Sequence, residues 1–142
     1  MLTMGEFPQF GWATEGFERK EGHSGSGVGD DTCSWGFDGH RIMKWNDGDQ
    51  PFGKVWVAGD VLGLAIDLMD KTVSFSVNGD YCEPCGVAFS NIDVPAGWIM
   101  PALTSDSGTY RVNFGDRSFK HTPPNESYQS VASGMQQQQQ HK

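Results

Sequence analysis

Two different hydrophobic patterns follow each other in the middle of the chain. Residues 61–67 (VLGLAID) carry apolar side chains at positions of both parities, which is typical of a strand covered on both faces. Residues 72–78 alternate instead, so Val73, Phe75 and Val77 share one face and polar side chains share the other. Turn-forming residues lie between and after the two segments. The pattern predicts a β-hairpin whose second strand is half-exposed.

Shorter segments of the same kind occupy most of the remaining sequence. No stretch of ten or more residues has a convincing 3.6-residue period, so we expect very little helix. Many short strands separated by Gly-containing turns favour a β-sandwich or a barrel. We expect the side chains of Trp12, Trp35 and Trp98 in its core. Further strands are expected at residues 9–14, 34–38, 40–45, 86–89, 98–103 and 110–114.

The character of the sequence changes at Thr122. Pro123 and Pro124 cannot continue a central strand, and the chain then becomes polar and ends in SVASGMQQQQQHK. Such a segment buries too little apolar surface to offset the entropy lost on ordering. We therefore expect one domain at residues 9–121 and a disordered, Gln-rich tail at residues 122–142.

The charge balance restricts the partners. Eighteen acidic and ten basic residues give a net charge of −8, and the basic residues form no cluster. Nucleic-acid binding takes much of its affinity from Lys and Arg at phosphates, so nucleic acid and anionic membrane surfaces are both disfavoured. A neutral or basic protein partner fits this charge better.

Targeting signals and cysteine content bear on location. The sequence has no apolar span of 18 residues, and its first ten residues lack the pattern of a signal peptide. With an odd number of cysteines and no secretory signal, reduced thiols are expected. We therefore expect a soluble protein of the cytoplasm.

Seven sequence blocks, in a fixed order, carry a family resemblance. They are FGWAT, GVGDD-x-x-SWGFDG, W-x-x-GDVLGLAIDL, VSFSVNG, GVAFSNI, W-x-MPAL and VNFG-x-x-x-F. Together they resemble a SPRY domain, the core of the B30.2 fold, over residues 9–121. The block around GDD and SWGFDG is most similar to SPRY domains of ryanodine receptors and of large HECT and RING ubiquitin ligases.

The resemblance implies both a fold and a function. The fold is all-β, a bent sandwich of two antiparallel sheets. The function is protein interaction without catalysis and without a cofactor, through loops at one edge of the sandwich that bind a peptide or a partner domain. A ligase context would make the domain a substrate recruiter. A ryanodine-receptor-like context would make it a packing domain in a large assembly, which is the alternative.

The N-terminus departs from the family pattern. SPRY domains usually begin with an extra aromatic strand, similar to YYFEV, whereas only MLTMGEFP precedes Gln9 here. We expect that the chain is a fragment of a longer protein or a truncated gene model, or else that its first strand is missing.

The resemblance also places a partner-binding surface. Trp45 aligns with an aromatic peptide contact of peptide-binding SPRY domains, although Trp45 in the core is the alternative. Exposed Trp side chains make good anchors because they bury a large area with few rotatable bonds. The loops around residues 22–31, 45–50 and 104–109 would form the surface. Its expected contact residues are Trp45, Asp47, Ser105, Asp106, Ser107, Gly108, His23 and Asp30.

Other chemistry has weaker support. Cys82 and Cys85 have the spacing of half a zinc site or a redox pair, but the remaining ligands would have to come from Cys33 and scattered His residues. The acidic turns at Asp30-Asp31 and Asp47-Gly48-Asp49 lack the residue spacing of an EF-hand calcium site. By the family resemblance, Asp31 and Asp38 would instead bind loop backbone. We therefore expect no metal site and no catalytic site.

Overall fold

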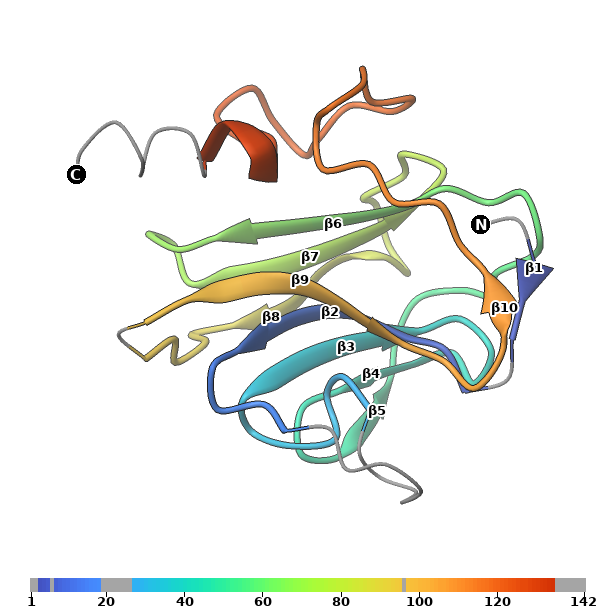
Figure 1. Cartoon of the computed structure of the whole chain (residues 1–142), viewed down its shortest axis with the longest axis horizontal. Helices are drawn as coiled ribbons and strands as arrows, with labels where there is room; N and C mark the ends of the chain where they lie inside the picture. The colour runs from blue at the N-terminus through green and yellow to red at the C-terminus, as the bar shows by residue number, and fades with distance from the viewer. Residues whose placement is uncertain (1–2, 6, 19–26, 96, 135–142) are drawn as a thin grey trace.

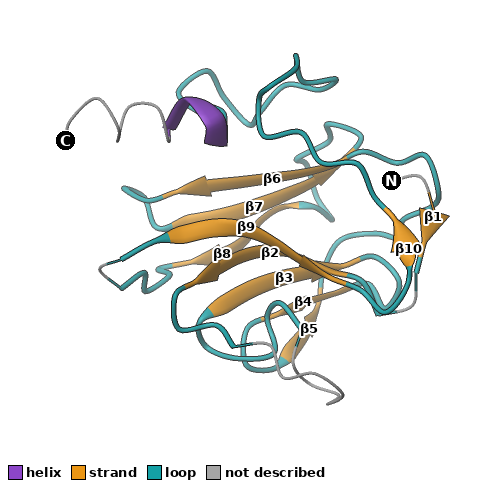
Figure 2. Ribbon diagram, viewed as in Figure 1, coloured by secondary structure: helices purple, strands orange, loops and turns teal. Residues whose placement is uncertain are grey.

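The computed structural model describes residues 3–5, 7–18, 27–95 and 97–134. This part of the chain contains short strands and a single helical turn at residues 131–134 (Figures 1 and 2). The strands are β1 (Thr3–Met4), β2 (Gln9–Thr14), β3 (Ser34–Asp38), β4 (Met43–Trp45), β5 (Asp49–Pro51), β6 (Leu62–Asp67), β7 (Thr72–Val77), β8 (Gly86–Ser90), β9 (Ile99–Thr104) and β10 (Gly108–Thr109). No helix in the described residues is both long and apolar enough to cross a membrane.

Two antiparallel sheets form a sandwich, which confirms the predicted all-β fold. The larger sheet has the order β5-β4-β3-β2-β9, and the smaller has the order β6-β7-β8. A separate two-stranded pair joins β1 to β10. No aromatic strand precedes β2 in the described residues.

Aromatic rings fill the space between the sheets. Phe37 lies at the centre, stacked on Phe75 of the opposite sheet with ring centroids 5.1 Å apart and edge-on to Trp56 at 4.8 Å. Trp12 and Trp35 face each other across β2 and β3 and are buried in this core, as predicted. Burial of each such ring contributes on the order of 2–3 kcal/mol.

Trp98 does not belong to the core, and its predicted burial is wrong. It immediately precedes β9, where Ile99 packs against the core cluster. Because neighbouring residues of an extended strand face opposite ways, Trp98 points outward and is 48% exposed. Trp56, from the connection after β5, is fully buried in the core.

The hairpin at the centre of the sequence forms, but the predicted exposure of its strands is wrong. Ser74 and Ser76 on β7, the central strand of its sheet, are buried like Val73, Phe75 and Val77 on the opposite face. The polar face of β7 is covered by Tyr81, which lies near Ser76, and by Tyr128, which lies near Thr72. The residues of β6, expected to be covered on both faces, are mostly half-buried because β6 is an edge strand.

Several strand boundaries differ from the predictions. The strand predicted at residues 40–45 begins only at Met43, because Asp38 accepts the backbone N–H groups of His40 and Arg41 and turns the chain there. β5 was not predicted. Residues 110–114 form no strand, and no described strand pairs with them.

The C-terminal segment contacts the smaller sheet. Within the predicted tail, residues 122–134 lie beyond β6 in Figure 1. Val131 packs against the core cluster, and the Ala132 N–H donates to the Phe114 carbonyl at 2.9 Å. Residues 135–142 lie outside the described residues.

Candidate partner-binding surface

Two hydrogen bonds join the three loops in which the sequence places the binding surface. The Val28 N–H donates to the Thr104 hydroxyl group at 3.0 Å. The Asp47 N–H donates to the Gly29 carbonyl, also at 3.0 Å. Residues 27–31 therefore lie between the turn after β4 and the turn after β9, and the three loops form one continuous surface.

Gly29 makes this close approach possible. A Cβ atom at this position would lie 2.5 Å from the Trp45 carbonyl oxygen and 2.6 Å from the Trp45 Cβ. The φ angle of +95° is also one that side-chain-bearing residues rarely adopt. Gly29 is thus explained by loop packing against β4, whereas a Cβ atom at Gly27 would lie 2.1 Å from the Gln9 side-chain oxygen and 2.9 Å from the Thr104 hydroxyl group.

Trp45 lies on the outer face of the larger sheet. Lys44 points inward from β4, and its ammonium group donates to the Ala88 carbonyl at 2.5 Å. Trp45 therefore points outward and is half-buried, outside the core cluster and opposite Asp49 of β5. The alternative in which Trp45 is a core residue does not describe this structure.

Arg41 is held between two aromatic rings. Its guanidinium carbon lies 4.5 Å from the centroid of the Trp45 ring and 5.1 Å from that of Phe7. The same group bonds the fully buried Asp38 carboxylate. A stacked cation of this kind contributes about 0.5–2 kcal/mol and fixes the orientation of both rings.

Sequence reasoning missed both Phe7 and Arg41. The three-residue spacing of Asp38 and Arg41 is a usable signal, because the pair lies on either side of a tight turn. Phe7 has no comparable signal, since its contact with Arg41 depends on the fold.

Asp30 is a predicted contact residue whose carboxylate is already bonded within the loop. One oxygen accepts the Gln9 side-chain amide at 2.8 Å, and the other accepts the Gly27 N–H at 2.7 Å. Asp31 accepts the Cys33 N–H at 2.9 Å and the Ser34 hydroxyl group at 2.8 Å, so its predicted role in binding loop backbone is confirmed.

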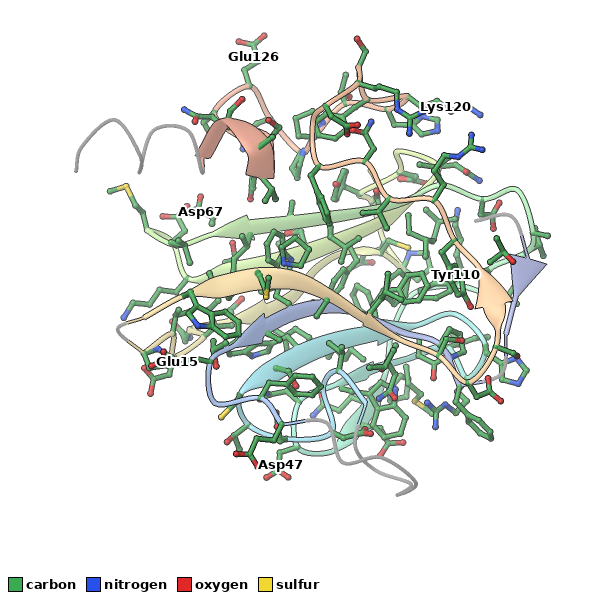
Figure 3. The ribbon with its side chains drawn as sticks, in the orientation of Figure 1. Glu15, Asp47, Asp67, Tyr110, Lys120 and Glu126 are labelled. Atoms are coloured by element: carbon green, nitrogen blue, oxygen red, sulfur yellow. The ribbon has the colours of Figure 1, made fainter. Side chains whose placement is uncertain are left out.

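The turn after β9 presents three exposed residues, Asp106, Ser107 and Gly108. Tyr110 stabilises this turn, because its hydroxyl group donates to the Ser107 carbonyl at 3.2 Å and accepts the Gly5 N–H at 3.0 Å. Figure 3 shows Tyr110 beside β10. Ser105 is half-buried and donates to the same Ser107 carbonyl at 2.6 Å.

Among the described residues of these loops, the exposed charge is acidic. Asp47, Asp49 and Asp106 are all exposed, and Figure 3 shows Asp47 at the rim of the molecule. In the part of the chain that the structure describes, Arg41 is a cation close to them, and it is paired with Asp38. The surface therefore offers a half-buried aromatic side chain beside acidic groups. His23, also a predicted contact residue, lies outside the described residues.

The two cysteines of the CEPC segment have different surroundings. Cys82 is exposed, whereas Cys85 belongs to the core cluster. Burial raises the pKa of the Cys85 thiol, against a smaller opposing effect of Lys54. Among the described residues, no three His, Cys, Asp or Glu side chains come together as a metal site would require.

A comparison with protein families matches residues 3–117 to the SPRY domain. Similar proteins include the E3 ubiquitin-protein ligase RKP of Arabidopsis thaliana, 39% identical over 80% of the chain and 9% of the ligase. The probable ATP-dependent RNA helicase ddx1 of Dictyostelium discoideum is 32% identical over 75% of the chain and 13% of the helicase. The human heterogeneous nuclear ribonucleoprotein U-like protein 2 is 30% identical over 83% of the chain and 15% of that protein. The chain thus matches only a small part of each relative.

Proposed function

Because this chain belongs to the SPRY domain family, we propose that it is a non-catalytic module that binds a protein or peptide through the loops around residues 22–31, 45–50 and 104–109. The observation that carries the proposal is the joining of these loops by the hydrogen bonds of Val28 and Asp47. Loops fixed on a rigid sandwich suit recognition, because little ordering entropy is lost on binding.

Trp45 and Asp106 are the proposed anchors, on two of the three loops. Trp45 offers a large ring whose orientation is fixed by Arg41, and Asp106 offers a carboxylate on the exposed turn. Asp47, Ser107 and Gly108 complete the exposed part, whereas Asp30 and Ser105 act mainly by holding their loops.

The ligand is proposed to be a neutral or basic protein segment. The exposed carboxylates of the surface favour positive charge through association rate and specificity. RNA is a poor fit, although two relatives are an RNA helicase and a ribonucleoprotein by name. A net charge of −8 and few cations on the described surface oppose contact with phosphates.

The similarity to an E3 ubiquitin-protein ligase suggests the setting. In a ligase, a domain of this kind would recruit the substrate while another part of the protein performs the transfer. The proposal for this chain is therefore substrate recruitment within a larger intracellular protein.

A variant with both Trp45→Ala and Asp106→Ala tests the proposal by affinity capture from cell extract. The double variant should lose the proteins that the wild type recovers, because each anchor of a protein interface is worth roughly 2 kcal/mol or more. Val55→Ala is the matched control, since Val55 is exposed but lies outside the three loops. Equal recovery by the folded double variant, checked by circular dichroism, would remove these loops from the site.

The second candidate function is a packing domain of a large assembly. It is favoured by the small share of each relative that the chain matches and by the many large apolar side chains on the described surface. A packing domain would recover no protein in the capture experiment, and its double variant would behave as the wild type does.

A further inference from the structure

Two large apolar side chains project from the outer face of β9. Trp98 and Met100 are two positions apart, so they lie on the same face, and they are 48% and 50% exposed. β9 is a six-residue edge strand, so its start lies about 20 Å from the turn that follows it. The surface at its start is therefore separate from the loops proposed above.

The turn between β6 and β7 adds further apolar surface at this end of the molecule. Leu68 is 55% exposed and Met69 is 93% exposed. The Ile92 N–H donates to the Lys71 carbonyl at 3.1 Å, so this turn is joined to the connection that leads to Trp98. Figure 1 shows the turn and the start of β9 at the same end, and Leu68, Met69, Trp98 and Met100 are called the hairpin-end surface below.

The turn that carries Leu68 and Met69 is held in place. The Asp67 carboxylate accepts the Met69 N–H at 3.0 Å and the Asp70 N–H at 2.9 Å. These bonds fix the backbone that carries the exposed side chains of Leu68 and Met69. The exposure is therefore a property of the fold at this turn.

The charges around the hairpin-end surface are mostly negative. Glu15, Asp70 and Asp93 are exposed, and a Cβ atom at Gly97 would lie 2.8 Å from a Glu15 carboxylate oxygen. Figure 3 shows Glu15 and Asp67 at this same end. Lys71 is the cation that the described part of these segments provides.

We propose that the hairpin-end surface binds a basic, amphipathic segment of a partner protein. Large exposed apolar side chains within a polar rim mark interaction sites in folded proteins, and Met and Trp are favoured at such sites. The acidic rim selects positive charge on the partner, which pairs with Glu15, Asp70 and Asp93. This second surface does not rest on the proposed role of the loops.

The test uses a synthetic peptide of Leu and Lys, about 16 residues or roughly four helical turns long, and a matched peptide with Glu in place of Lys. The Lys peptide should bind the whole chain, and the Glu peptide should bind at least about tenfold more weakly. Trp98→Ser with Met100→Ser should weaken binding of the Lys peptide about tenfold or more. Phe119→Ser is the matched control, since Phe119 is also 48% exposed but lies elsewhere, and it should change the affinity less than about twofold.

A second measurement keeps the test independent of the stability of the variants. In the wild type, the Trp98 indole N–H signal, assigned with Trp98→Phe, should shift when the Lys peptide is added. Three results would each overturn the proposal. They are equal binding of both peptides, a loss of affinity in Phe119→Ser as large as that in the Trp98 and Met100 variant, and a Trp98 signal that does not move at saturation. Loss of capture by the Trp45 and Asp106 variant, with peptide binding intact, would show that the two surfaces act separately.

Discussion

At the scale of single residues, the carboxylate of Asp38 connects the fold to the candidate surface. It is fully buried, turns the chain after β3 through two backbone N–H groups, and bonds Arg41. Arg41 in turn lies against the ring of Trp45. The family resemblance predicted the structural role of Asp38 but not its link to Trp45, because that link depends on contacts formed only in the folded chain.

Asp38→Ala should therefore lower the free energy of unfolding by about 2–4 kcal/mol, because it removes three hydrogen bonds, one of them to a charged partner. Urea denaturation of wild type and variant measures the change. Asp49→Ala is the control, since Asp49 is exposed on β5 and should change stability by less than about 0.5 kcal/mol. Two variants of equal stability would show that Asp38 does not hold this turn.

At the scale of elements, the structure protects most strand edges from pairing with other chains. Pro51 lies on β5 and Pro101 on β9, and each lacks the N–H that an added strand would need. The pairing of β7 with β8 shifts between Val73 and Ser74, which leaves Ala88 as a bulged residue. Lys44 then bonds the carbonyl of that residue.

Lys44→Met should cost about 1.5–3 kcal/mol, because it removes a hydrogen bond from a charged donor while keeping an apolar stem of similar length. Thermal or urea unfolding measures this loss of stability. Self-association of the variant at rising protein concentration would show that the β8 edge has become open to pairing. Lys120→Met, at an exposed position in Figure 3, is the matched control. A variant at Lys44 no less stable than this control would contradict the role assigned to the bulge.

Most strands were predictable at this scale, although β5 was missed and residues 110–114 form no strand, and the exposure of the strands was less predictable. Alternation placed Val73 and Phe75 in the core correctly. It failed for Ser74 and Ser76, since Tyr81 and Tyr128 from later in the sequence cover them. For Trp98 the error was the opposite one, since a residue predicted to be buried is exposed. Hydrophobicity alone does not show which of the two alternating sets of side chains on an edge strand faces inward.

At the scale of the whole molecule, the two-sheet sandwich follows from the sequence. The packing of its C-terminal segment does not. The low complexity of the tail predicts disorder from Thr122, yet Val131 contacts the core and Tyr128 contacts the smaller sheet. Those contacts come from isolated apolar residues in a polar segment. The average composition of the segment does not reveal such single residues. The joining of three distant loops through Val28 and Asp47 was predicted only by family resemblance, since their separation in sequence gives no local signal.

The most direct test of the proposed binding surface is amide hydrogen exchange of the whole chain, with and without a partner recovered by capture. Binding should slow exchange in the described loop residues 27–31, 45–50 and 104–109, because their backbone becomes covered. The β7 amides should exchange at the same rate in both states, since they are already buried. Slowed exchange confined to other parts of the chain at full occupancy would contradict the account.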